Sequence, residues 1–172
     1  MSKGTITPPD GGRIIRVSAL VAQLPWRQAI LRISRNQDRD ASQIWTADEK
    51  NPATEERALD KDFILLSYPC GDGSFDAAIS WAKENRLRMT VARDVFAIGA
   101  RKQYTRKTFG AKQICTISAS TTFNENGSRS TCNVWWSKIG RGAGVMIVDD
   151  FNGQDEWIAF VEGSEAEGDE GL

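Results

Sequence analysis

The residues of this sequence that could carry out enzyme chemistry are few and widely spaced. Histidine, the commonest general base and metal ligand, does not occur among the 172 residues. The cysteines are too few and too scattered for a zinc site or a disulfide framework, and we interpret them as buried or idle thiols: Cys70, Cys115 and Cys132. Serine- or cysteine-histidine catalysis is therefore excluded.

Three aspartates near predicted helix starts could in principle supply paired carboxylates: Asp72, Asp76 and Asp94. Nothing in the sequence places them at one site, and helix capping explains them without any catalytic role. We therefore expect no catalytic residue, no cofactor and no enzyme activity. The sequence favours a binding protein.

The tryptophan pair in CNVWWSK (132–138) is the first candidate for ligand contact. Neighbouring residues of a strand point to opposite faces of the sheet. The face shared by Cys132, Val134 and Trp136 is the more apolar, so we expect Trp136 in the core and Trp135 turned outward. An outward Trp135 would be a good anchor for a protein partner or a sugar ring. The alternative is that another part of the chain covers it.

Acidic residues surround Asn152-Gly153, the strongest short signal for a β-hairpin. A two-residue turn there pairs Val148 with Trp157, Ile147 with Ile158 and Val145 with Phe160. It also sets Asp149 opposite Glu156 and Asp150 opposite Asp155, which is unfavourable because like charges repel across a strand pair.

Three explanations of this conflict stay open: a longer turn, carboxylates that splay into water, or a bridging cation. Oxygen ligands suit calcium, but DDFNGQDE lacks the spacing of a calcium loop. We therefore predict no metal, with the four carboxylates as a candidate cation site only.

A basic, aromatic segment, RKQYTRKTFGAK (101–112), is predicted to be a surface loop. Its cations and tyrosine could contact phosphates and stack on bases, or the loop could simply be solvated. The glycine-rich GRGAG (140–144) lacks the pattern of a phosphate-binding loop and is predicted to be a flexible turn. The candidate binding residues are Trp135, Lys138, Arg141, Asn152, Trp157, Arg101, Lys102, Tyr104, Arg106 and Lys107.

The net charge of −1 hides an asymmetry along the chain. Residues 1–144 hold all 22 Lys and Arg against 14 Asp and Glu, a net charge of +8, whereas residues 145–172 hold nine acids and no base. A basic body with an acidic tail is typical of some proteins that bind single-stranded nucleic acids, in which the tail competes for the binding groove. The alternative is a solvated surface with a frayed end.

The order of predicted elements indicates an α+β fold, with two short helices packed on a mainly antiparallel sheet. A strand at 13–22, a helix at 24–34 and a polar stretch at 35–61 precede a strand at 62–71. Helices at 74–88 and 90–99 follow, with Ser74 and Thr90 as caps, and the remainder is predicted to be β. We divide the chain into a flexible arm and polar segment (1–61), an α+β domain (62–162) and a disordered acidic tail (163–172). The sequence leaves open whether residues 1–61 share the core.

The stretch SFDAAISWAKENRLRMTVARDVFAIG (74–99) resembles the start of bacterial and phage C-type-lectin-like domains. In those domains an amphipathic helix with an alanine and a tryptophan leads into LRL-[AP]-T-x-x-E-[LV]. Here Met89 stands at the alanine or proline position and Asp94 at the glutamate position. The stretches 132–137 and 157–161 are similar to their late strands. The resemblance covers about residues 62–162 and implies a scaffold whose late strands and loops bind proteins or glycans without catalysis.

These observations together predict a non-enzymatic binding module, a structural, receptor-binding or protein-interaction component of a phage or phage-derived assembly. The alternative is a protein that binds single-stranded nucleic acid and is regulated by its acidic tail. We expect a protein or glycan ligand, with nucleic acid as the alternative, and membership of a larger assembly or a homo-oligomer. No apolar run approaches the ~18 residues that a membrane-spanning helix needs. The N-terminus lacks a signal-peptide core, so we expect a cytoplasmic or virion-associated protein.

Overall fold

A computed structural model describes residues 5–22, 24, 26–33, 58–69, 74–102, 104, 106–110, 113–123 and 126–163. The elements are, in chain order, β1 (Arg13–Val21), α1 (Trp26–Leu31), β2 (Leu59–Ser67), α3 (Ser74–Glu84), β3 (Arg88–Met89), α4 (Ala92–Gly99), α5 (Arg106–Phe109), β4 (Ile114–Ser118), β5 (Thr122–Phe123), β6 (Arg129–Ser137), β7 (Gly140–Ile147), the 3₁₀ helix η1 (Val148–Asp150) and β8 (Glu156–Val161). The predictions for Cys70, Asp72, most of the polar stretch and the tail beyond Gly163 lie outside the described residues.

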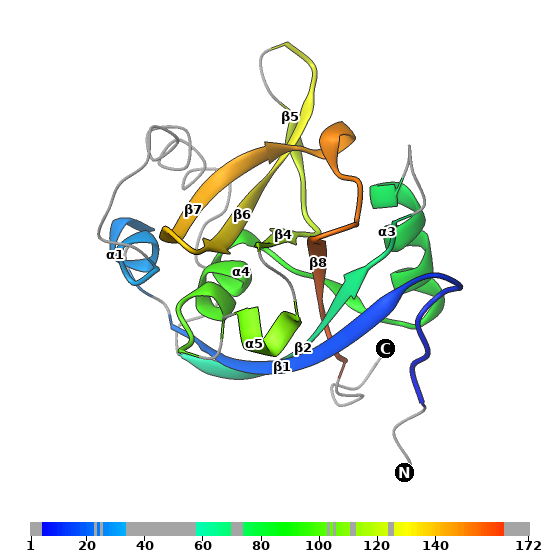
Figure 1. Ribbon diagram of the computed structural model, residues 1–172, viewed down its shortest axis with the longest axis horizontal. Helices are drawn as coiled ribbons and strands as arrows, with labels where there is room; N and C mark the ends of the chain where they lie inside the picture. Colours follow the sequence, from blue (N-terminus) through cyan, green and yellow to red (C-terminus); the bar gives the residue numbers. More distant parts are fainter. Residues whose placement is uncertain are drawn as a thin grey trace, which may run out of the picture.

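The eight strands form one curved sheet, so the predicted α+β class is confirmed. The strand order is β1-β2-β8-β4-β6, with β7 and β5 also paired to β6 and β3 paired to β8. Only β4 and β8 run parallel, and the other pairs are antiparallel. Figure 1 shows the sheet curving from β1 to β7 around α4 and α5.

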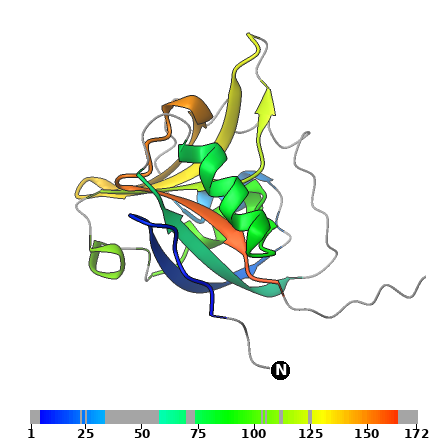
Figure 2. The same cartoon turned by 90° about the vertical axis from the view of Figure 1, so that its right-hand side faces the viewer.

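Each face of the sheet carries its own hydrophobic core. Phe63 and Leu65 of β2 face the cluster around α4, while Ile64 and Leu66 face the cluster around α3. This is why β2 is a continuous apolar run, as expected of a strand buried on both faces. Figure 2 shows α3 in front of β8, on the side of the sheet away from α4. We call the α4 side of the sheet the inner face and the α3 side the outer face.

The described strand and helix of the N-terminal region belong to the same core. β1 pairs with β2 without interruption from Arg13↔Ser67 to Val21↔Leu59. Ala19 and Val21 are buried in the inner core together with Ile30 and Ile33 from the α1 region. The domain therefore begins well before the boundary predicted at residue 62.

The start of α4 differs from the prediction. Its N-cap is Val91, whose backbone N–H donates to Asp94 Oδ2 at 3.0 Å, so the capping role predicted for Asp94 is confirmed. Thr90 is fully buried, and its hydroxyl donates to the carbonyl of Ala159 at 2.6 Å and accepts from the N–H of Ala119 at 2.9 Å. Thr90 therefore ties β4 to β8 rather than capping the helix.

The hairpin predicted around Asn152-Gly153 does not exist, and its strand register is wrong. β7 ends at Ile147 and pairs with β6, η1 follows, and β8 lies between β2 and β4 in the middle of the sheet. The physical reason is the composition of β8, which is apolar on both faces and is buried from Trp157 to Val161. The predicted opposition of carboxylates disappears with the hairpin.

Candidate binding surface at the β6–β7 hairpin

The hairpin of the late strands is formed by β6 and β7, joined by the two residues Lys138 and Ile139. Ser137 pairs with Gly140, and Gly140 has a φ of +144°, which glycine adopts readily. The Ser137 hydroxyl oxygen accepts the N–H of Ile139 at 3.3 Å. GRGAG is thus the start of a strand and not the flexible turn that was predicted. The side chain of Ile139, at the tip of this turn, is apolar and 83% exposed to solvent.

The two tryptophans next to this tip lie on opposite faces, as strand parity predicts. Trp136 pairs with Ile114 and Arg141 and packs against the inner core. Trp135 lies on the outer face, away from both core clusters. Both side chains are half-buried, so Trp136 is less enclosed than we expected.

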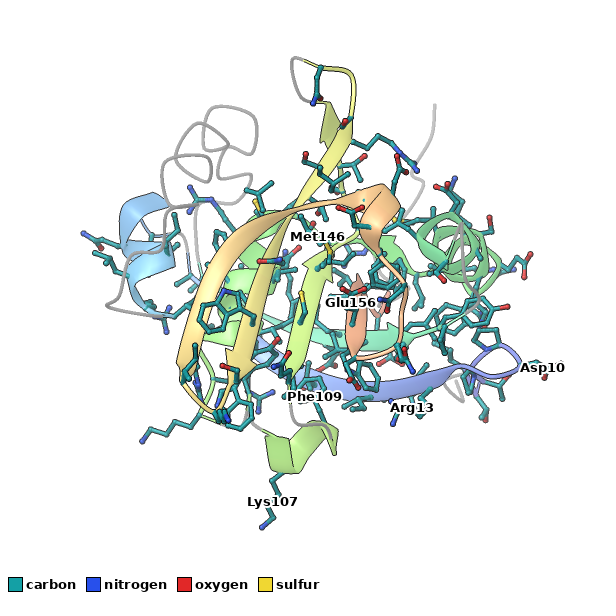
Figure 3. The ribbon with its side chains drawn as sticks, turned by 45° about the horizontal axis from the view of Figure 1, so that its top comes forward. Asp10, Arg13, Lys107, Phe109, Met146 and Glu156 are labelled. Carbon is teal, nitrogen blue, oxygen red and sulfur yellow. The ribbon has the colours of Figure 1, made fainter. Side chains whose placement is uncertain are left out.

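The indole of Trp135 packs on β7 at a glycine, so it contacts the backbone of that strand. Its cross-strand neighbours on the outer face are Gly142 of β7 and Cys115 of β4, and Glu156 of β8 follows Cys115 in the same row. The indole lies so close over Gly142 that a Cβ there would collide with the six-membered ring. Figure 3 looks onto this face and shows Met146 and Glu156 over it, with no described helix in front.

Arg141 connects the hairpin to the basic segment after α4. Its guanidinium donates to the carbonyl of Arg101 at 2.7 Å and to that of Lys102 at 3.1 Å. Arg141 is therefore engaged inside the protein and is not free for a partner, contrary to the prediction. Its effect is to hold the backbone of Arg101 and Lys102 against β7.

This contact brings the basic segment beside the hairpin, and we call the end of the hairpin together with this segment the hairpin surface: Lys138 and Ile139 at the turn, Trp135 on the outer face, Trp136 on the inner face, and Arg101 and Lys102 held against β7. Lys102 and Lys138 are exposed and Arg101 is half-buried. Among the described residues, no carboxylate lies within ion-pair distance of these three cations. The hairpin surface is apolar at the tip and positively charged around it.

Two predicted binding residues are core residues and cannot contact a ligand at the surface. Trp157 is 1% exposed, and its ring meets Phe109 edge-on at a centroid distance of 5.5 Å. Tyr104 is 2% exposed, and its hydroxyl lies 3.0 Å from both Thr116 Oγ1 and the carbonyl oxygen of Val134. Both face α5, a four-residue helix that the sequence did not reveal within the basic segment and that closes over them.

Lys107 and Asn152 are at the surface but outside the hairpin surface. Lys107 points outward from α5 (Figure 3), and the side chain of Arg106 lies outside the described part. Asn152 is exposed in the loop before β8, where its side-chain oxygen accepts the N–H of Gln154 at 2.9 Å. Sequence reasoning missed Ile139, although an isoleucine between Lys138 and Gly140 in a turn is itself unusual and could have suggested a contact residue.

The four carboxylates of the candidate cation site do not converge. Asp149 lies 3.5 Å from the guanidinium of Arg129, which also holds Asp76 through two contacts at 2.9 and 3.1 Å. Glu156 accepts the backbone N–H of Asn152 at 2.8 Å. Within the described ranges no three His, Cys, Asp or Glu side chains are grouped to hold a metal. The paired arginine lowers the pKa of Asp76 from its usual value.

Burial dominates the environment of the two described thiols, and the lowering effect of the Asn133 hydrogen bond on the pKa of Cys115 is smaller. Burial raises the pKa of Cys115 to about 12, and the nearby carboxylate of Glu156 acts in the same direction. Burial alone raises the pKa of Cys132 to about 12. Both thiols are therefore neutral at pH 7, which agrees with their interpretation as idle thiols.

Alkaline pH should reduce stability through Cys132. Because its folded pKa is above the unfolded value of 9.0, its contribution is intact below pH 9 and is lost as pH rises toward 12. At pH 10 the loss is on the order of 1 kcal/mol for one such thiol. Urea unfolding at pH 8 and pH 10 measures it, and Cys132→Ala should show a pH dependence weaker by that amount. Equal pH dependence in both proteins would contradict this assignment.

No helix in the described part of the chain is long and apolar enough to cross a membrane. Comparison of the chain with protein-family models, with curated proteins and with solved structures finds no match to any of them.

Proposed function

We propose that this protein is a non-enzymatic binding module whose hairpin surface docks onto a protein partner. The observation that carries the proposal is that one end of the β6–β7 hairpin combines exposed Ile139 at its tip, a half-exposed tryptophan on each face and three cations that have no acidic partner in the described part. Tryptophan and arginine are the residue types most enriched among the energetically important contacts of protein interfaces. Charge complementarity then favours an acidic rim around an apolar patch on the partner.

The rigidity of the support also favours a binding role. Trp135 is packed on the backbone of Gly142, and Arg141 fixes the neighbouring basic segment with two hydrogen bonds. A contact surface that is already ordered loses less conformational entropy on binding than a flexible loop does. The contact residues of the hairpin surface are therefore already ordered before a partner binds.

A finer description is part of the same proposal: a C-type-lectin-like domain from a phage or phage-derived assembly, acting as a structural, receptor-binding or protein-interaction component. Its support is the order of α3 and α4 before the late strands β4, β6, β7 and β8, together with the motifs in 74–99 and 132–161. The late strands are the part that carries the hairpin surface, as the resemblance implies.

Selection of ligands followed by substitution at the hairpin tests this proposal. A displayed peptide library and a glycan array are each exposed to the folded protein, and the affinity of every selected ligand is measured by calorimetry. For peptide ligands, Trp135→Ala should weaken binding by about 30-fold, as loss of a central tryptophan anchor does. Ile139→Asp should abolish binding, because it buries a charge.

The control is Lys107→Ala, an exposed cation on α5 outside the hairpin surface, which should leave the affinity unchanged. Circular dichroism should show that all three variants remain folded. Ligands that bind equally well to wild-type protein and Trp135→Ala would refute the hairpin as the site. Ligands found only on the glycan array would refute a protein partner.

A second candidate, binding of single-stranded nucleic acid, is favoured by one observation. Lys102, Lys138 and Arg101 surround two half-exposed indoles, and cations beside aromatic rings can hold phosphates while bases stack. A gel shift with oligothymidylate over a series of salt concentrations tests it, since phosphate contacts make the affinity fall steeply with salt. Retained binding by the double variant Lys102→Glu/Lys138→Glu, or no binding at low salt, would exclude this candidate.

A further inference from the structure

β1 is a long and regular edge strand at the opposite end of the sheet from the hairpin surface. It pairs residue for residue with β2 over nine positions, without a bulge, and contains no proline. Figures 1 and 2 both show β1 at the border of the sheet, with no described element beyond it. Proteins commonly protect such edges with prolines, bulges or short strands, because the free N–H and C=O groups can pair with another strand.

The edge is also apolar where an ordinary surface strand would be polar. Leu20 is 51% exposed on the outer face, and Ile14, Ile15 and Val17 are only half-buried. A second strand beside β1 would cover these side chains and satisfy the free backbone groups of the edge.

Antiparallel pairing of β1 with a second β1 is self-complementary about Val17. This register opposes all nine residues, and opposed residues share a face because their numbers have the same parity. On the outer face Ile14 meets Leu20 of the second copy, and on the inner face Ile15 meets Ala19. Val17 meets its own equivalent at the two-fold axis. Apolar residues oppose apolar residues at these positions, whereas Arg13 opposes Val21 at each end of the register.

The remaining outer-face pair is polar. Arg16 would oppose Ser18 of the second copy, and the Ser18 hydroxyl donates to Asp62 Oδ1 at 2.6 Å. A hollow of about 440 Å³ lies beside these residues, with Arg16, Asp62 and Glu162 in its lining. It holds two carboxylates and one guanidinium, which lies 3.6 Å from Glu162. In this register, Arg16 of the other copy would lie beside Ser18 and Asp62.

We infer that two copies of this chain associate through antiparallel pairing of their β1 strands about Val17, forming one continuous sheet across a two-fold axis. Such an isologous interface uses the same residues from both copies, so each favourable pair occurs twice. The inference does not depend on the hairpin surface, which stays exposed on each copy at the far end of the sheet.

Sedimentation velocity over a wide range of protein concentration tests the association. The expected result is a species of twice the 19.0 kDa chain mass that dissociates on dilution. Leu20→Lys should shift the protein to monomer, because it removes an apolar pair on each side of the axis and places a charge there. The matched control is Leu59→Lys, at a position 43% exposed but one strand away from the edge, which should leave the dimer intact.

A charge reversal, followed by a compensating substitution, tests the register of the proposed strand pair. Arg16→Glu should give monomer, because the new carboxylate faces Ser18 and Asp62 of the other copy, and adding Asp62→Lys should restore the dimer. In a protein with Cys70 replaced by Ser, Val17→Cys should form an intermolecular disulfide on mild oxidation, since opposed Cα atoms lie about 4.5–5.5 Å apart. Ser18→Cys should not, because its equivalent would lie about 7–8 Å away on the diagonal.

A monomer at every concentration would overturn the inference. So would a dimer that persists in the folded Leu20→Lys variant, or a Val17→Cys protein that fails to cross-link while the wild type is dimeric.

Discussion

Replacing Trp157 with alanine is expected to lower the free energy of unfolding by about 3–5 kcal/mol, the usual cost of removing a large buried aromatic side chain. Trp157 is 1% exposed and packs against Phe109, with the guanidinium of Arg13 5.2 Å from its ring centroid. The change would leave a cavity between β8, β1 and α5. Urea unfolding monitored by circular dichroism measures the loss.

Two controls distinguish packing from other roles of this residue. The indole N–H of Trp157 has no hydrogen-bond partner among the described residues. Trp157→Phe therefore keeps most of the packing without breaking a polar contact there, and it should cost less than about 1.5 kcal/mol. Trp135→Ala, at a half-exposed position, should also cost less than about 1.5 kcal/mol, because little buried area is lost. A Trp157→Ala protein as stable as the wild type would show that Trp157 is not a core residue.

Gly153→Ala is expected to destabilise the fold by about 2–4 kcal/mol, from backbone strain and overpacking together. Gly153 has a φ of +72°, which residues with a Cβ adopt only at a cost. A Cβ there would also collide with the carbonyl oxygen of Tyr68, and this backbone atom cannot turn aside as a flexible side chain could. The carbonyl of Gly153 further accepts the hydroxyl of Ser67 at 2.6 Å. Thermal unfolding should show a lower midpoint.

Gly127→Ala separates the two causes. Gly127 has a similar φ of +82°, but an added Cβ would meet nothing within 4 Å. It should therefore cost only about 1 kcal/mol, the backbone component alone. If Gly153→Ala and Gly127→Ala lowered the free energy of unfolding equally, the collision with Tyr68 would make no contribution to the loss.

Local patterns predicted most of the elements because their causes lie in neighbouring residues. The apolar spacing within 74–99 gives α3 and α4, and strand parity in 132–138 separates Trp135 from Trp136. The Asn152-Gly153 signal failed because a local turn preference competes with tertiary burial. The strand that follows is apolar on both faces and is more stable between β2 and β4 than beside β7.

The candidate site was predictable in its parts but not in its assembly. The sequence indicated the importance of Trp135, Lys138 and the basic segment separately. It could not show that Arg141 donates to the carbonyls of Arg101 and Lys102, a contact across 40 residues that joins these parts. Nor could it show that α5 closes over Tyr104, since a helix of four residues has too few positions to produce a periodic signal.

The central position of β8 governs how the chain can fold. β1 and β2 can pair early, and β4, β6 and β7 can form a meander. Among the described strands, β8 alone is paired with both halves, through β2 and β4. During synthesis, each half would expose an apolar edge until residues 156–161 have left the ribosome and β8 can form. Contacts between such distant segments slow folding and leave intermediates open to aggregation. The strand β8 thus turns the two halves into a single cooperative unit.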